Sequence, residues 1–161
     1  MNIALFLQMA AEACPDRPAL TYDGKHYTYA QLFSAAKRAA LYFSTGNCKF
    51  VCLLDTSSPA TPIALMGAAI AGIPYVPLNY RLSEEQLTPL LDRISPAYLI
   101  SGPRNETYDF DGWVVQDSAD FLSDVLNGEE VEVAWHEDPS AVAVQLFTSG
   151  TTGIPKAALL R

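Results

Sequence analysis

The sequence is poor in the residues that form disulfides and metal sites. Its 161 residues include three cysteines and two histidines, and no C-x-x-C pair occurs. Cys52 follows Cys48 by four positions within the apolar run 50–54, so burial as a small hydrophobe explains it better than metal or disulfide chemistry. His26 and His136 lie far apart in the sequence, and we interpret both as surface residues. We therefore predict no metal site.

Basic residues are scarce as well. Ten Lys and Arg residues stand against eighteen Asp and Glu residues, which gives a formal net charge of −8. A nucleic acid needs a basic surface to neutralise its phosphates, so the charge argues against that class of partner. It argues equally against an anionic membrane surface, and a soluble protein with an acidic surface is the simpler interpretation.

No apolar run is long enough to cross a membrane. Residues 1–11 are apolar but lack a basic n-region, and Gln8 and Glu12 interrupt them. Residues 60–76 are broken at Gly72 and are too short for a bilayer. The first residues instead form one apolar face of a helix, made of Ile3, Phe6, Leu7, Ala10 and Ala11. We predict no signal peptide, no stable membrane span and a cytoplasmic location.

Half of the chain is apolar, which is enough for one core and argues against two independent domains. Near the start, Asp23 and Gly24 predict a two-residue hairpin turn between short strands. Thr28 then predicts a helix N-terminus, because Gln31 three residues later completes a capping box. We expect this helix to run to about Ser44.

From residue 50 onwards, the pattern alternates between buried strands and helices. Short apolar runs at 50–54, 75–76 and 98–100 predict strands, and the segment between the first two predicts a helix capped at Thr61 that stops at Gly72. Helices of about a dozen residues between buried strands predict right-handed βαβ units. The predicted fold class is therefore α/β, with a largely parallel sheet flanked by helices.

The next part of the chain is more polar. A strand is predicted near 113–115 and a short helix near 118–126, and the acidic stretch 129–138 is interpreted as a solvated connection. Asp55 follows a strand at a position where open α/β sheets often bind ligands, although loop capping explains it better. We divide the chain into a lead-in (1–48), a βαβ core (49–101), a connecting region (102–140) and a final strand with a loop (141–161).

That final loop is the most informative feature of the sequence. An apolar run at 141–147 leads into T-S-G-T-T-G-I-P-K at 148–156. Glycines allow backbone N–H groups to approach an anion, hydroxyls add donors and lysine adds a positive charge, so the loop is predicted to bind phosphate. The candidate binding residues are Thr148, Ser149, Gly150, Thr151, Thr152, Gly153 and Lys156.

The sequence of this loop does not match three other known motifs. In the P-loop of NTPases the lysine follows the second glycine directly, whereas Ile154 and Pro155 separate Gly153 from Lys156 here. The first glycine of the dinucleotide fingerprint is missing. A nucleophile elbow would need glycine at Phe147.

The loop resembles the signature loop of the adenylate-forming superfamily, which includes acyl-CoA synthetases, non-ribosomal-peptide adenylation domains and luciferases. Residues 14–20 (C-P-D-R-P-A-L) look like the opening of acyl-CoA synthetases, and residues 75–83 (Y-V-P-L-N-Y-R-L-S) resemble their P-L-N-x-R-L segment. Glu137 or Asp138 before the last apolar run also fits. The resemblance implies that the chain forms part of the large N-terminal domain of such an enzyme.

The resemblance also implies a two-step reaction. A carboxylic acid attacks MgATP to give acyl-AMP and pyrophosphate, and a thiol of coenzyme A or of a phosphopantetheine carrier protein then displaces AMP. By the same resemblance, the hydroxyl and glycine residues of the loop would hold the β- and γ-phosphates, and Lys156 would neutralise them. The expected cofactors are therefore ATP and Mg²⁺.

Two departures from the family pattern matter. Ala157 stands where the family usually has glycine, which need not remove phosphate binding. Family enzymes are also several times longer, and their catalytic lysine and their adenine, ribose and acyl sites lie downstream of this loop. We therefore expect an N-terminal fragment that contains no catalytic residue and is inactive alone.

Three functional hypotheses remain. A ligase acting on a fatty or other hydrophobic acid is favoured, because residues 77–83 look more like acyl-CoA synthetases. An amino-acid or aryl-acid adenylation domain is the second. The third is a non-catalytic module that binds phosphate, nucleotide or a protein partner.

Overall fold

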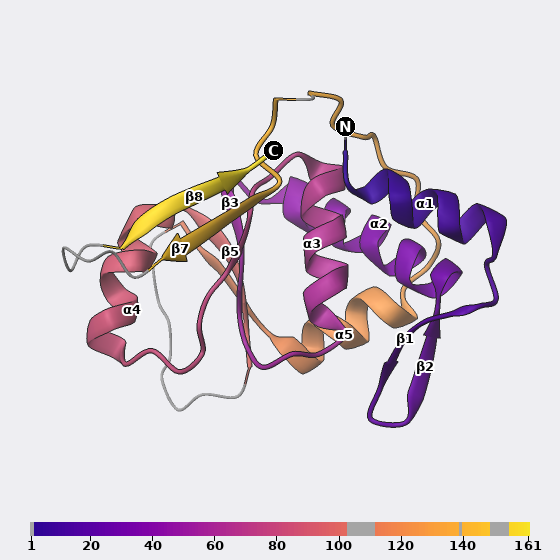
Figure 1. Ribbon diagram of the computed structural model, residues 1–161, viewed down its shortest axis with the longest axis horizontal. Coiled ribbons are helices and arrows are strands. Elements are labelled where there is room, and N and C mark those ends of the chain that lie inside the picture. Colours follow the sequence, from indigo (N-terminus) through magenta and orange to yellow (C-terminus); the bar gives the residue numbers. More distant parts are fainter. Residues whose placement is uncertain (1, 103–111, 139, 149–154) are drawn as a thin grey trace.

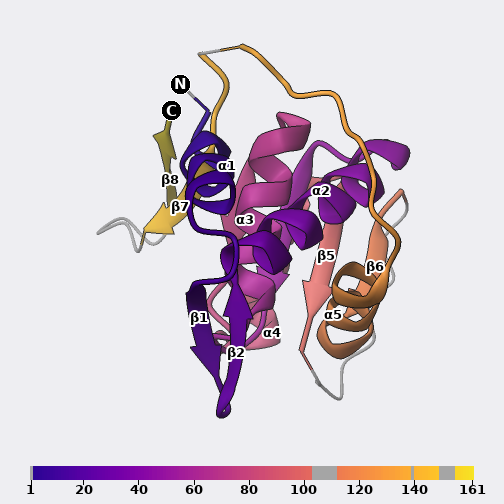
Figure 2. The same cartoon turned by 90° about the vertical axis from the view of Figure 1, so that its right-hand side faces the viewer.

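The chain alternates helices and strands along most of its length (Figures 1 and 2). The computed structural model describes residues 2–102, 112–138, 140–148 and 155–161. Its helices are α1 (Ala4–Ala13), α2 (Tyr29–Thr45), α3 (Ala60–Ala71), α4 (Glu84–Leu91), the 3-10 helix η1 (Asp92–Ile94) and α5 (Ser118–Asn127). Its strands are β1 (Pro18–Tyr22), β2 (Lys25–Thr28), β3 (Phe50–Leu54), β4 (Tyr75–Pro77), β5 (Ala97–Ser101), β6 (Val114–Asp117), β7 (Val144–Thr148) and β8 (Lys156–Leu160).

The central sheet has six strands in the order β6-β5-β3-β4-β7-β8. The pairs from β6 to β7 are all parallel, and β8 alone runs antiparallel to its neighbour. This arrangement confirms the predicted α/β fold with a largely parallel sheet. It results from crossover connections, because parallel neighbours cannot be joined by a tight turn.

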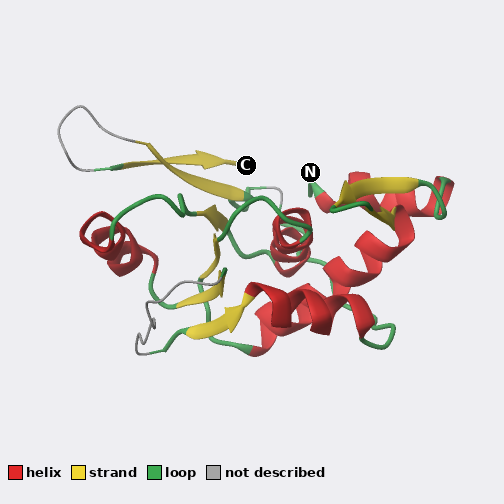
Figure 3. Ribbon diagram, turned by 90° about the horizontal axis from the view of Figure 1, so that it is seen from below, coloured by secondary structure: helices red, strands yellow, loops and turns green. Residues whose placement is uncertain are grey.

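Helices cover both faces of the sheet, as Figure 3 shows from below. Val51 and Leu53 of β3 point into the cluster formed with α2, α3 and α5. Cys52 and Leu54 point the other way, into a second cluster with α4 and η1. The continuous apolar run of β3 is therefore buried on both sides, which is typical of parallel sheets.

The predicted burial of Cys52 is confirmed, since none of its surface is exposed. Burial raises the pKa of its thiol and, to a smaller extent, that of Cys48. Burial therefore disfavours the thiolate form of both residues. His26 and His136 are exposed, as predicted.

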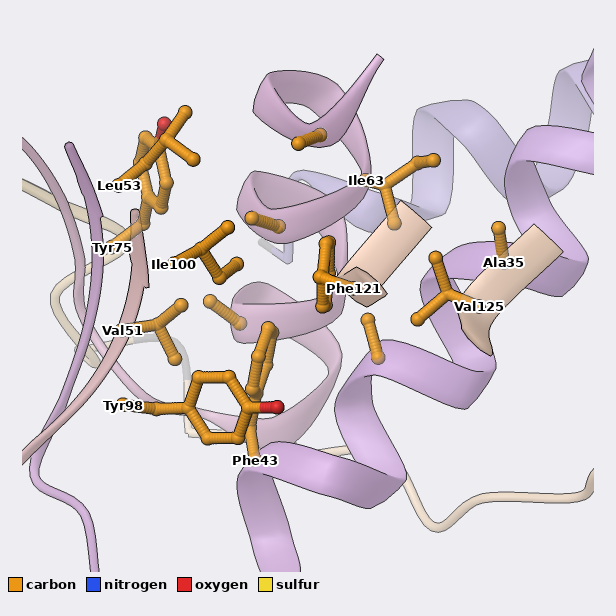
Figure 4. Packing of buried hydrophobic residues seen from close by; sticks show 14 of the residues in the cluster. Ala35, Phe43, Val51, Leu53, Ile63, Tyr75, Tyr98, Ile100, Phe121 and Val125 are labelled. Carbon is orange, nitrogen blue, oxygen red and sulfur yellow. The ribbon is translucent and has the colours of Figure 1, made fainter. Parts of the chain in front are cut away.

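Aromatic side chains fill the core beneath α2 (Figure 4). The Phe43 ring lies edge-on to Tyr98, with 5.0 Å between ring centroids, and is stacked on Phe121 at 6.1 Å. Phe43 and Phe121 are completely buried. These three rings join α2, β5 and α5 into one unit.

Local sequence signals account for the start of α2, the β1–β2 turn and the end of α3. The Thr28 N–H donates to Gln31 Oε1 at 2.9 Å, and the Gln31 N–H donates to Thr28 Oγ1 at 3.2 Å, so the predicted capping box is present. The turn at Asp23 and Gly24 is confirmed, and both residues have positive φ. Gly72 ends α3 in the left-handed conformation, as a C-terminal glycine often does.

The predicted start of α3 is wrong. The helix begins at Ala60 rather than after Thr61, and the Ala60 N–H donates to Ser58 Oγ at 3.2 Å. Pro62 still lies in the first turn, where its missing N–H costs nothing. The hydroxyl two residues upstream of the helix therefore takes the role that was assigned to Thr61.

The acidic stretch 129–138 is more than a solvated connection. Lys37 Nζ lies 3.5 Å from carboxylate oxygens of both Glu130 and Glu132, whose side chains remain exposed. The apolar residues alternate with these acids, and Val133 and Trp135 pack against buried residues of α2 and α3. Residues 129–138 therefore lie along α2 and α3, with acidic side chains in solvent and apolar side chains packed against the helices. We call this segment the acidic strap.

Arg38 holds the start of this strap. Its Nε donates to the Val125 carbonyl at 2.5 Å, and its Nη1 donates to the Glu129 carbonyl at 3.0 Å. Burial lowers the pKa of its guanidinium, which nevertheless stays protonated near neutral pH.

Among the residues that the structure describes, no helix is both long and apolar enough to pass through a bilayer.

Candidate nucleotide phosphate-binding site

The candidate site lies at the turn between β7 and β8. Ser149, Gly150, Thr151, Thr152 and Gly153 lie outside the described residues. Thr148 is the last residue of β7 and Lys156 is the first residue of β8. Of the seven candidate residues, the structure therefore describes the first, Thr148, and the last, Lys156.

Thr148 and Lys156 face each other across the hairpin. They are register partners in the antiparallel pair, and Thr148 Oγ1 donates to the Lys156 carbonyl at 3.3 Å. Both residues are exposed. The strand pairing thus brings a hydroxyl and an ammonium group, eight positions apart in the sequence, to the same end of the hairpin.

This end of the hairpin lies at the edge of the sheet where ligands bind in open α/β folds. β7 is parallel to β4, and β4 is parallel to β3, so Thr148 lies at the same carboxyl edge as Leu54 and Pro77. Side chains and loops at this edge are free to contact a ligand, because the helices that follow the strands leave it open. The hairpin therefore places Thr148 and Lys156 at the carboxyl edge of the parallel strands.

Asp55, at the same edge, does cap its own loop as predicted. Its Oδ1 accepts from the Thr56 N–H at 2.6 Å and from Thr56 Oγ1 at 3.3 Å. A methyl group added to Gly102 would lie 2.2 Å from this oxygen, so the carboxylate fills the space that the glycine leaves. Asp55 thus closes the gap between the ends of β3 and β5.

One residue beside the site carries no sequence signal. Arg93 of η1 donates from Nη1 to the Pro155 carbonyl at 2.5 Å. Its Cζ lies 5.3 Å from the centroid of the Phe147 ring. Arg93 precedes these partners by more than fifty residues, and only the tertiary structure brings them together.

The base of the hairpin is joined to the rest of the sheet through β4. Val144 is the register partner of Tyr75, and the Tyr75 N–H donates to the Ala143 carbonyl at 3.0 Å. Among the residues that the structure describes, the buried Tyr75 hydroxyl has no hydrogen-bond partner, and burial raises its pKa. Within the described ranges, no group of three or more His, Cys, Asp or Glu side chains is arranged to hold a metal ion.

Known proteins resemble this chain along most of its length. The family model of the AMP-binding enzymes matches residues 7–161. Surfactin synthase subunit 3 of Bacillus subtilis is 29% identical over 96% of this chain and 12% of its own length. The 2-succinylbenzoate–CoA ligase of the same organism is 27% identical over 94% of this chain and 32% of its own length.

A solved structure shares the fold. The structure of a fatty acyl CoA synthetase of Mycobacterium tuberculosis superposes with a TM-score of 0.82 at 24% identity, over 99% of this chain and 34% of that protein. The chain thus spans about a third or less of the length of these relatives. With the signature loop, the sheet and the family match in agreement, the chain belongs to the AMP-binding enzymes, the adenylate-forming family that its sequence resembles.

Proposed function

We propose that the chain is the phosphate-binding, N-terminal part of an ATP-dependent carboxylate–thiol ligase. The observation that carries the proposal is the hairpin, which places Thr148 opposite Lys156 at the carboxyl edge of the parallel sheet. The T-S-G-T-T-G-I-P-K sequence joins these two residues. A loop of this composition supplies N–H and O–H donors to a polyphosphate.

The proposed roles follow from the charge that develops during adenylation. A carboxylate oxygen of the substrate attacks the α-phosphorus of MgATP, and the bond to the bridging oxygen breaks to release pyrophosphate. Negative charge builds on this leaving group, so fixed donors and a cation beside it lower the barrier. Thr148, Ser149, Gly150, Thr151, Thr152 and Gly153 hold the β- and γ-phosphates, and Lys156 neutralises their charge.

The second step is transfer to a thiol. The sulfur attacks the acyl carbon of the acyl-adenylate, AMP leaves and a thioester forms. The relatives include a CoA ligase, a surfactin synthase subunit and a D-alanine–D-alanyl carrier protein ligase. Coenzyme A and a carrier-protein thiol therefore both belong to the proposal as acceptors.

For the acid, we favour a fatty or other hydrophobic carboxylic acid. The support is the resemblance of residues 75–83 to acyl-CoA synthetases. An aryl acid or an amino acid is the alternative, and a screen of carboxylates in pyrophosphate exchange would separate the three classes.

The test of the phosphate role uses Lys156→Ala in a full-length enzyme that contains this chain. Removing one electrostatic contact to a developing charge typically lowers the rate by about 10²–10³-fold. We expect that loss in carboxylate-dependent ATP–pyrophosphate exchange, and a much smaller loss in thioester formation from pre-made acyl-adenylate. Equal losses in both steps would show that Lys156 does not act on pyrophosphate. The 161-residue chain alone should show no exchange.

A further inference from the structure

The hairpin that carries the signature loop has only a narrow attachment to the sheet. β4 and β7 share one register pair, Tyr75 with Val144, at the base of the hairpin. Thr148 lies four residues further on, roughly 13 Å away for an extended strand. All five residues of β8 are exposed. Pairing with β4 alone would therefore leave the loop end free to swing about its base.

Arg93 contacts the hairpin at this loop end. Its guanidinium lies over the ring of Phe147 in β7 and donates to the carbonyl of Pro155, which precedes β8. Phe147 directly precedes Thr148, and Pro155 directly precedes Lys156. One side chain thus reaches both ends of the signature loop.

The backbone that carries Arg93 is firmly held. Leu91 and Ile94, on either side of it, are almost completely buried in the cluster between the sheet and α4. Phe147 packs against the same cluster. Arg93 therefore projects from a fixed base toward an exposed hairpin. Its flat guanidinium can stack on a ring and donate in its own plane at the same time, which a lysine ammonium cannot do.

We propose that Arg93 is a positioning residue that holds the two ends of the signature loop in register for polyphosphate binding. It acts through Phe147 and Pro155, and it fixes the loop end of the β7–β8 hairpin against the cluster between the sheet and α4. The inference rests on the proposed function, because it assigns the loop to the phosphates of ATP. No residue type or spacing in the sequence marks Arg93 for this role.

The test compares Arg93→Ala, Arg93→Lys and Lys156→Ala in a full-length enzyme that contains this chain. Lys25→Ala is the matched control, because Lys25 is also an exposed cation over a ring, 5.0 Å from the Tyr27 centroid. It lies on the β1–β2 hairpin, at the opposite end of the molecule (Figure 1). Amide hydrogen exchange reports the order of the hairpin, and calorimetric titration with inorganic pyrophosphate reports binding.

We expect Arg93→Ala to speed exchange at the loop end of β7 and β8 by about tenfold, without change in β3 or β5. Pyrophosphate affinity should fall by a similar factor, and Arg93→Lys should restore only part of each effect. Lys156→Ala should weaken binding without changing exchange, and Lys25→Ala should change neither. A merely structural role would instead raise exchange throughout the sheet.

The two proposals fail in different ways. A wild-type full-length enzyme that does not bind pyrophosphate would overturn the proposed function. Unchanged exchange in the hairpin of Arg93→Ala would overturn the positioning role. Faster exchange with unaltered pyrophosphate affinity would overturn it too, because the loop would then bind phosphate without the help of Arg93.

Discussion

Two strands of similar apolar composition, β3 and β8, have opposite surroundings. Leu54 of β3 is fully buried, whereas Leu159 and Leu160 of β8 are 48% and 51% exposed. β3 pairs with strands on both sides and has helices on both faces, while β8 pairs with β7 at the end of the strand order. Burial therefore depends on position in the sheet, which the apolar pattern of a strand does not specify.

The contrast assigns different tasks to the two regions. The β3–β5 region with α2, α3 and α5 provides the core that stabilises the fold. The β7–β8 hairpin contributes less buried surface and presents the signature loop. Elements that move or bind ligands generally come from the less stable parts of a structure. Substitutions in the core should therefore change stability, and substitutions at the hairpin should change binding.

The largest expected effect is in the aromatic core. Phe43→Ala removes a fully buried ring that contacts Tyr98 and Phe121. We expect the free energy of unfolding to fall by about 3–5 kcal/mol, since the cavity cannot close fully. Urea denaturation followed by circular dichroism measures the loss. Leu41→Ala is the control, because Leu41 lies on the same helix and is 42% exposed. Equal losses for the two variants would contradict the assignment of the core.

A smaller loss is expected where α2 and α3 cross. A methyl group added to Gly67 would lie 2.7 Å from Ala39 Cβ and 3.0 Å from the Ala36 carbonyl oxygen. Gly67→Val should therefore push the helices apart and cost about 1–3 kcal/mol of stability. At Gly46 the nearest atom, a methyl carbon of Val114, is 3.8 Å away, so Gly46→Val should be nearly neutral. A neutral Gly67→Val in thermal unfolding would show that the crossing is loose.

A pH-dependent effect of still smaller size is expected from Tyr98. Its hydroxyl donates to Gln116 Oε1, and burial raises its pKa from 10.0 to about 12. The unfolded chain therefore loses this proton first as the pH rises. The neutral phenol contributes stability that is complete below about pH 10 and is lost as the pH approaches 12.

Denaturation at a series of alkaline pH values would measure this contribution. Tyr98→Phe should be less stable at neutral pH, because it lacks the hydrogen bond, but its stability should fall less between pH 10 and 12. Parallel pH profiles for the variant and the wild type would show that Tyr98 is not the titrating group.

The smallest effect is expected in β8, where it sharpens the comparison with β3. Leu159→Ala removes a side chain that is half exposed, so stability should change by about 0.5 kcal/mol or less. The matched variant in β3, Leu54→Ala, should cost about 2–5 kcal/mol. Similar losses in urea denaturation would mean that β8 stabilises the fold as β3 does.

Much of the architecture could be predicted from local signals. The apolar runs, the turn at Asp23 and Gly24 and the Thr28–Gln31 capping box act over a few residues, so the sequence shows them directly. The start of α3 was misplaced because Thr61 followed by Pro62 resembles a helix N-terminus, whereas Ser58 provides the hydrogen bond. Two hydroxyl residues three positions apart can compete for the same role, and local propensity does not separate them.

The acidic strap makes contacts that local sequence signals do not predict. Its carboxylates predicted a solvated segment, and Glu130 and Glu132 are exposed as expected. That Trp135 packs near Phe33, with 6.2 Å between ring centroids, could not be predicted, because the segment has no regular structure of its own. The packing depends on where α2 lies after the chain has folded.

The sequence by itself determined the α/β class, the family and the signature loop, because these depend on short-range periodicity and on an ordered motif within nine consecutive residues. Only the tertiary structure decided which apolar strand is buried, how Lys37 and Arg38 hold the acidic strap, and that Arg93 reaches the Phe147 ring and the Pro155 carbonyl. These contacts join residues that are distant in the chain. Their formation depends on the strand order and on helix packing, which no local pattern encodes.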